Sequence, residues 1–171
     1  MQGTMVKIVA FEPQLAALLP VTYNLLVSSN LTVHDRVSRI ILHGSRGPAG
    51  KYRPDSDIDL SLIVEPEAGK SQFELEDLLH NVFDVTKSQW GGNIEVDLAV
   101  VFDVRNCDLN CFEYPQWDDG ICQQGGTDCF GLYKIGKGFN GLVTNAGIQV
   151  KLMYPCLKIW ERTGVDNDVM M

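Results

Sequence analysis

The segment from Arg39 to Leu60 constrains the fold of this 171-residue chain more than any other part of the sequence. It begins with the aliphatic run Ile40-Ile41-Leu42, which is typical of a buried strand. The run ends at Gly44-Ser45, and a loop rich in glycine, proline and cationic residues follows. A second apolar run, from Ile58 to Val64, predicts another strand. The segment therefore predicts a strand, a loop and a strand.

Two carboxylates interrupt the second apolar run on one face only. Asp57 and Asp59 are two residues apart, and side chains at that spacing lie on the same side of a strand. Their charges would repel, and a hard divalent cation such as Mg²⁺ or Mn²⁺ removes this conflict. The alternation in Ile94 to Val101 puts Glu95 and Asp97 on one face of a further strand. We therefore predict Asp97 as a third carboxylate of the site, with Glu95 as the fallback.

These residues resemble a known pattern. Gly44-Ser45, then Asp57-Ile58-Asp59-Leu60, then a separate strand bearing Asp97 is similar to the nucleotidyltransferase superfamily that includes DNA polymerase beta. The resemblance is greatest to the small bacterial minimal nucleotidyltransferases, and it covers residues 33–103. One departure is visible, because members of that group often continue after Gly-Ser-Arg with a second arginine and an Ala-Arg-Gly run. This chain has Gly47-Pro48-Ala49-Gly50 there.

The resemblance implies an activity and a cofactor. Such enzymes transfer a nucleoside monophosphate from an NTP, here expected to be ATP, to an acceptor by a two-divalent-metal mechanism. By this resemblance Asp57 and Asp59 would bridge the Mg²⁺ or Mn²⁺ ions. Asp97 would hold the ion nearer the acceptor and could take the acceptor's proton. The predicted catalytic and metal-binding residues are therefore Asp57, Asp59 and Asp97.

The loop between the first two strands is the predicted nucleotide-binding segment. Glycine lets the backbone approach a phosphate closely, and a short helix expected after the loop would present free N–H groups to an anion. Cationic side chains in the loop could neutralise a triphosphate, although a solvated cationic loop is the alternative. His43, at the end of the first strand, is interpreted as a packed or surface imidazole. The predicted nucleotide-binding residues are Gly44, Ser45, Arg46, Lys51, Arg53 and Ser56.

The periodicity predicts an α/β (α+β) fold, and the resemblance specifies a small mixed or antiparallel sheet palm with flanking helices, the nucleotidyltransferase fold. Helices are expected over residues 11–29, split at Pro20, and over residues 71–89. Strands are expected over residues 38–43, 58–65 and 93–102. Thr32 is expected to cap a short turn, with His34 on the surface.

We expect one domain, residues 1–171, with its core over residues 33–103 and a Gly- and Cys-rich extension over residues 104–171. The extension could be a specificity cap, an interface or more sheet. Residues 105–145 show no convincing period, whereas residues 147–160 predict an edge strand.

Composition excludes several classes of protein. The net charge of −8 argues against broad nucleic-acid binding, which needs a cationic surface. No apolar run approaches the roughly 18 residues that a membrane span needs, and the first residues lack a secretory pattern, so a cytoplasmic protein is expected. Four of the five cysteines, Cys107, Cys111, Cys122 and Cys129, have spacings that do not match a paired zinc motif. Reduced structural thiols are the favoured interpretation.

Three functional hypotheses remain from the sequence. The first is an active nucleotidyltransferase acting on a small molecule, an RNA end or a protein side chain. The second is an antitoxin-type minimal nucleotidyltransferase that binds and adenylylates a small helical partner protein, which a neighbouring gene for such a partner would favour. The third is a non-catalytic domain that binds a nucleotide or a partner, against which the intact set of carboxylates argues.

Overall fold

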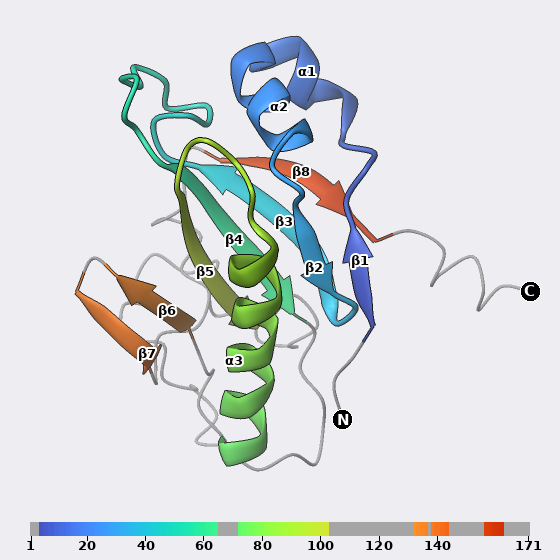
Figure 1. Ribbon diagram of the computed structural model, residues 1–171, viewed down its shortest axis with the longest axis vertical. Helices are drawn as coiled ribbons and strands as arrows, with labels where there is room; N and C mark the ends of the chain where they lie inside the picture. Colours follow the sequence, from blue (N-terminus) through green and yellow to red (C-terminus); the bar gives the residue numbers. More distant parts are fainter. Residues whose placement is uncertain (1–3, 65–71, 103–131, 137, 144–155, 163–171) are drawn as a thin grey trace, which may run out of the picture.

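The computed structural model describes residues 4–64, 72–102, 132–136, 138–143 and 156–162 (Figure 1). Its helices are α1 (Pro13–Leu18), α2 (Pro20–Val27) and α3 (Gln72–Gln89). Its strands are β1 (Met5–Lys7), β2 (Thr32–His34), β3 (Val37–His43), β4 (Ile58–Val64), β5 (Val96–Phe102), β6 (Leu132–Gly136), β7 (Phe139–Val143) and β8 (Leu157–Glu161). None of the helices described is both long enough and apolar enough to cross a membrane.

The two N-terminal helices follow the two prolines of that segment. Pro13 and Pro20 each stand in the first turn of a helix, where the missing N–H of proline has no helical partner to lose. Leu19, between the helices, has a non-helical backbone with φ −136°. The expected split of this segment is therefore confirmed. Figure 1 shows α1 and α2 above one end of the large sheet.

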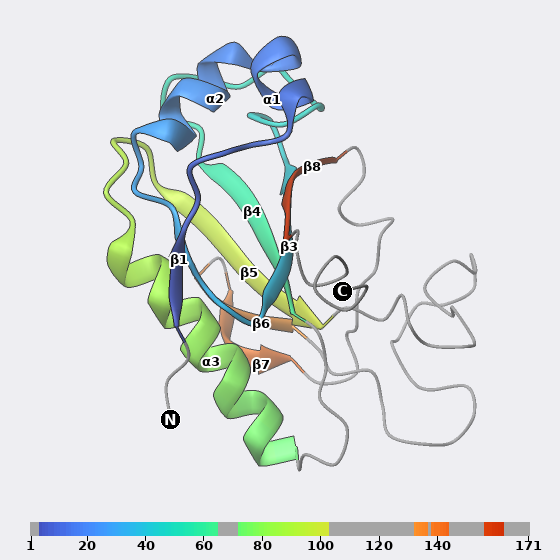
Figure 2. The same cartoon turned by 90° about the vertical axis from the view of Figure 1, so that its right-hand side faces the viewer.

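The large sheet has six strands in the order β7-β6-β5-β4-β3-β8. The neighbours β4 and β5 are parallel, and the other neighbouring pairs are antiparallel. A parallel pair needs a crossover, and α3 supplies it by lying across one face of the sheet (Figures 1 and 2). The predicted α+β fold with a mixed sheet is confirmed. A separate ribbon of β1 and β2 lies beside α3.

The core lies between the sheet and the layer of α3 and the β1–β2 ribbon. In β4 the residues Ile58, Leu60, Leu62 and Val64 are fully buried in it, while Asp59 is half-buried on the opposite face. This alternation follows from the pleat of a strand, which turns successive side chains to opposite faces. The other strands and α3 contribute Ile40, Leu42, Leu79, Val82, Phe83, Leu98, Val100, Tyr133 and Ile159.

The described part of the extension completes the sheet. The antiparallel pair β6–β7 extends the β5 edge, and β8 pairs with β3 at the other edge. The predicted edge strand is found only over its last part, as β8, while residues 144–155 lie outside the described residues. The sequence did not predict β6 and β7, because they are short and contain glycines that interrupt any alternation.

Two local expectations were wrong. The loop of residues 44–55 leads directly into β4 and not into a short helix, because only Ser56 and Asp57 separate the loop from that strand. Thr32 and His34 belong to β2, and His34 is buried instead of exposed. The cause is tertiary, because β2 packs against α3, where the hydroxyl of Thr86 donates a hydrogen bond to the carbonyl of Thr32 at 2.7 Å.

Candidate functional site

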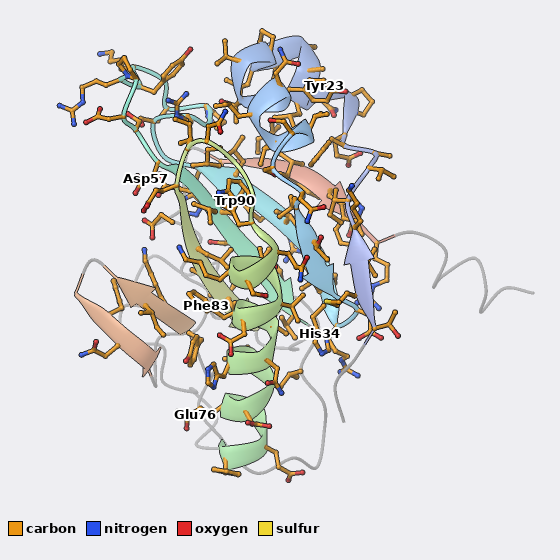
Figure 3. The ribbon with its side chains drawn as sticks, in the orientation of Figure 1. Tyr23, His34, Asp57, Glu76, Phe83 and Trp90 are labelled. Atoms are coloured by element: carbon orange, nitrogen blue, oxygen red, sulfur yellow. The ribbon has the colours of Figure 1, made fainter. Side chains whose placement is uncertain are left out.

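A row of polar side chains crosses three strands of the sheet on the face opposite α3. Asp59 on β4 is the register partner of His43 on β3 and of Asp97 on β5. Side chains at register partners lie on the same face, so His43, Asp59 and Asp97 are neighbours on one face of the sheet. Asp57 precedes β4 by one residue, and Figure 3 places it beside the loop at that end of the sheet. The predicted carboxylates Asp57, Asp59 and Asp97 are thus brought to one region of the sheet.

The turn at Gly44 lies directly against Asp59. Gly44 has φ +73°, a conformation that residues with a side chain rarely adopt. A Cβ atom at Gly44 would overlap the carboxylate oxygen Oδ2 of Asp59. Glycine is therefore required at this position for two reasons, the backbone conformation and the close approach of the carboxylate. The predicted motif residues Gly44 and Asp59 are therefore in contact. Ser45, the residue after Gly44, is half-buried in the turn.

Arg46, predicted to contact phosphate, lies inside its own loop. Its side chain is buried, and its Nε donates to the carbonyl of Ser56 at 2.7 Å. Its Nη2 lies 3.2 Å from the carbonyls of Arg53 and Pro54, and its guanidinium stacks 4.5 Å from the centre of the Tyr52 ring. These contacts close the loop on itself. The Thr22 hydroxyl of α2 also donates to the Arg46 carbonyl, at 2.7 Å.

The other predicted nucleotide-binding residues lie along the outside of this loop. Lys51 and Arg53 are exposed, and Lys51 has a positive φ of 65°. The Arg53 side chain is 81% exposed and lies 3.7 Å from the carboxylate of Asp55. Ser56 accepts a hydrogen bond from the Arg53 backbone N–H through its hydroxyl, at 2.8 Å, which is a turn contact. Of these three, the two cations remain accessible to an anion.

Lys134 on β6 is a site residue that the sequence did not reveal. Its Nζ lies 3.1 Å from Oδ1 and 3.2 Å from Oδ2 of Asp97. Lys134 is the register partner of Ala99. Ala99 follows Asp97 by two residues on β5, so the two lie on the same face of the sheet. No signal in the sequence could have found it, because it stands in a short strand without periodicity and 37 residues from its partner.

His43 lies beside the carboxylates, at the register position of Asp59. Its Nε2 lies 3.0 Å from the hydroxyl of Ser61. Ser61 follows Asp59 by two residues on β4 and lies on the same face. Burial lowers the pKa of His43, and the positive charge of Lys134 lowers it further, against the opposing effect of Asp97. This matches the expectation of a packed imidazole, and its neighbours place it within the polar row.

The donor chemistry of the row suits a hard divalent ion. Carboxylate oxygens are the ligands that Mg²⁺ and Mn²⁺ prefer, and the Lys134 ammonium already marks a cation position at Asp97. Among the residues that the structure describes, however, no group of three or more His, Cys, Asp or Glu side chains lies close enough to hold a metal. Glu95, the fallback, is exposed just before β5 begins.

The zinc question rests on four cysteines, Cys107, Cys111, Cys122 and Cys129, which lie outside the described residues. The fifth, Cys156, is a half-buried free thiol whose pKa is raised by burial. It packs against a small apolar cluster below the polar row, formed by Ile41, Ile63 and Val101.

Comparison with known proteins adds nothing to these observations, because no family model matches the chain and neither a curated protein nor a solved structure is significantly similar to it.

Proposed function

We propose that this protein is a nucleotidyltransferase that transfers a nucleoside monophosphate from an NTP, with ATP the first donor to test, to an acceptor nucleophile. One observation carries the proposal. The glycine turn after β3 packs against Asp59, and Asp59 shares its register with Asp97 on the parallel strand β5. The motif residues that resemble that superfamily, separated by up to 53 positions in the chain (from Gly44 to Asp97), are neighbours in space.

The chemistry follows from these side chains. In the transfer a bond forms between the acceptor oxygen and the α-phosphorus, and the bond from that phosphorus to the bridging oxygen breaks, so that pyrophosphate leaves with the electron pair. The proton of the acceptor hydroxyl would pass to Asp97. The turn at Gly44-Ser45 would bind the phosphates through backbone N–H groups and the serine hydroxyl. Asp57, Asp59 and Asp97 would hold Mg²⁺ or Mn²⁺, which would neutralise charge on the phosphates. The accessible cations Lys51 and Arg53 would screen the triphosphate from the acidic row, which is the set of carboxylates Asp57, Asp59 and Asp97.

The first experiment is calorimetric titration of the protein with ATP, GTP, CTP and UTP in the presence of Mg²⁺. Wild-type protein is expected to bind at least one NTP in a metal-dependent way, and Asp59→Asn is expected to remove that binding. Asp55→Asn is the matched control, because Asp55 is a carboxylate of the same loop whose side chain is 82% exposed. Metal-dependent binding by wild type and the control alone would support the proposal. Failure of wild type to bind any NTP would overturn it.

A second candidate is a non-catalytic domain that binds a nucleotide or a small helical partner protein. One observation favours it: the ammonium of Lys134 already pairs with Asp97, at the position where the transfer reaction would need a metal ion. The same titrations separate the two candidates. Binding of an NTP that neither Mg²⁺ nor Asp59→Asn affects would favour the non-catalytic domain.

A further inference from the structure

We propose that Lys134 is a built-in cation of the acidic row, and that a divalent ion binding at Asp97 must displace its ammonium. This inference rests on the proposed function, because it assigns to Asp97 the metal that the function requires. It adds Lys134, which the motif does not contain, and a competition between its ammonium and a divalent ion for Asp97.

The contact between Lys134 and Asp97 has the form expected of a bound cation. The ammonium lies nearly the same distance, 3.1 and 3.2 Å, from the two carboxylate oxygens. The side chains are only 17% and 11% exposed, so water screens the pair little. Asp97 is also the register partner of Asp59 on the adjacent parallel strand. The ammonium therefore stands at the position where two like charges most need a cation.

A metal ion and the ammonium would exclude each other at this position. Both are cations, both would use the oxygens of Asp97, and like charges a few ångströms apart repel strongly in a half-buried site. The ammonium makes a second contact at this place, because Nζ lies 5.2 Å from the ring centroid of Phe139, on β7, while it pairs with Asp97.

The test measures Mn²⁺ affinity without nucleotide, by calorimetry and by electron paramagnetic resonance of the free ion. Lys134→Met is expected to bind Mn²⁺ at least about tenfold more tightly than wild type, because the competing charge is gone. Lys134→Gln removes the charge but keeps a donor for Asp97, and it serves if the methionine variant does not fold. Lys158→Met is the matched control, a lysine on β8 that pairs with Glu161 at 2.6 Å and Glu12 at 3.5 Å. It is expected to bind like wild type.

A second readout is thermal unfolding with EDTA and with Mn²⁺. Without metal, Lys134→Met is expected to melt below wild type, because the acidic row has lost its cation. Mn²⁺ is expected to raise its midpoint by more than it raises that of wild type.

This inference would be overturned, and the proposed function would stand, if both Lys134 variants bound Mn²⁺ no more tightly than wild type while Asp59→Asn still abolished binding. Absence of Mn²⁺ binding in every variant and in wild type would overturn it together with the metal-dependent part of the proposed function.

Discussion

At the scale of single residues, the position of Gly44 is the most constrained in the described site. Its positive φ would be strained with any side chain, and the carboxylate of Asp59 fills the space where a Cβ would lie. Gly50 shares the same φ of +73°, but no atom lies within 4 Å of the point that its Cβ would occupy. A side chain at Gly50 would therefore cause backbone strain only, whereas a side chain at Gly44 would cause backbone strain and a steric overlap.

We predict that Gly44→Ala destabilises the protein more than Gly50→Ala. Backbone strain costs each variant about 1 kcal/mol, and the overlap with Asp59 adds roughly 1–3 kcal/mol at Gly44 only. Urea unfolding of the two variants and wild type measures the difference. Equal losses would mean that Asp59 moves aside without cost.

At the scale of elements, the loop between β3 and β4 is held by one buried side chain. Arg46 donates to three carbonyls of its own loop, and Thr22 of α2 holds the Arg46 carbonyl from outside. This arrangement explains how a segment with three glycines and two prolines keeps a defined shape without a helix. The side chain predicted to bind phosphate thus also shapes the loop.

Replacing this arginine should loosen the loop. Arg46→Met is expected to lower the free energy of unfolding by about 2–4 kcal/mol, because the carbonyls lose a charged donor inside the protein. Arg53→Met should change stability little, since the Arg53 side chain is 81% exposed. Urea unfolding and the rate of proteolysis within the loop measure both effects. A stable, protease-resistant Arg46→Met variant would contradict the role assigned to Arg46.

The β1–β2 ribbon makes stability depend on pH through His34. The backbone N–H of Arg36 donates to Nδ1 of His34 at 3.0 Å, which requires the unprotonated nitrogen. Burial lowers the pKa of His34 below 6.5, against the opposing charge of Asp35 and with the help of Arg36. Between that lowered pKa and 6.5 the unfolded chain binds more protons than the folded one, so stability falls as the pH falls through this window.

His34→Asn should weaken this dependence, because the amide oxygen can replace Nδ1 as acceptor and does not titrate. Unfolding free energies between about pH 7.5 and 5.5 are expected to fall less steeply for the variant than for wild type. Part of the slope should remain, since the lowered pKa of His43 acts in the same direction. Identical slopes would exclude His34 as a source.

At the scale of the whole molecule, the strands described after β5 belong to the same sheet as the motif residues. Ile159 on β8 is fully buried in the main core, and the carbonyl of Ile159 accepts a hydrogen bond from the N–H of Glu12 at 2.8 Å. Tyr133 on β6 lies in the same core beside Phe83 of α3. Both edges of the sheet are therefore formed by strands that come much later in the chain than the motif residues.

Ile159→Ala should consequently destabilise the entire domain. We expect a loss of about 2–5 kcal/mol from the buried cavity, with one cooperative transition seen by every probe. Ile135→Ala, on β6, is the control, because Ile135 is 52% exposed and should cost little. A variant in which β8 melts alone while the remaining signal is unchanged would show that β8 is a separate unit.

Local patterns predicted much of the fold and part of the site. The apolar runs of β3 and β4, the amphipathic α3 and the proline-split N-terminal helices are all encoded by neighbours in sequence, so their bounds were predictable to within two residues. The face on which Asp59 lies follows from the pleat of β4, whereas Asp57 stands one residue before that strand. The same reasoning failed for β6 and β7, whose short strands exist because β5 offers them an edge to pair with.

By itself, the sequence determined that a glycine turn, an Asp-x-Asp pair and a later aspartate would lie on strands or at their ends in an α+β fold, because periodicity and turn chemistry act over a few residues. Tertiary structure alone decided which cation meets which carboxylate. Arg46, next to the motif, turned inward to its own loop, and Lys134, from a distant strand, came to Asp97. The physical reason is that strand register, and not separation in the chain, sets the distances over which charges interact.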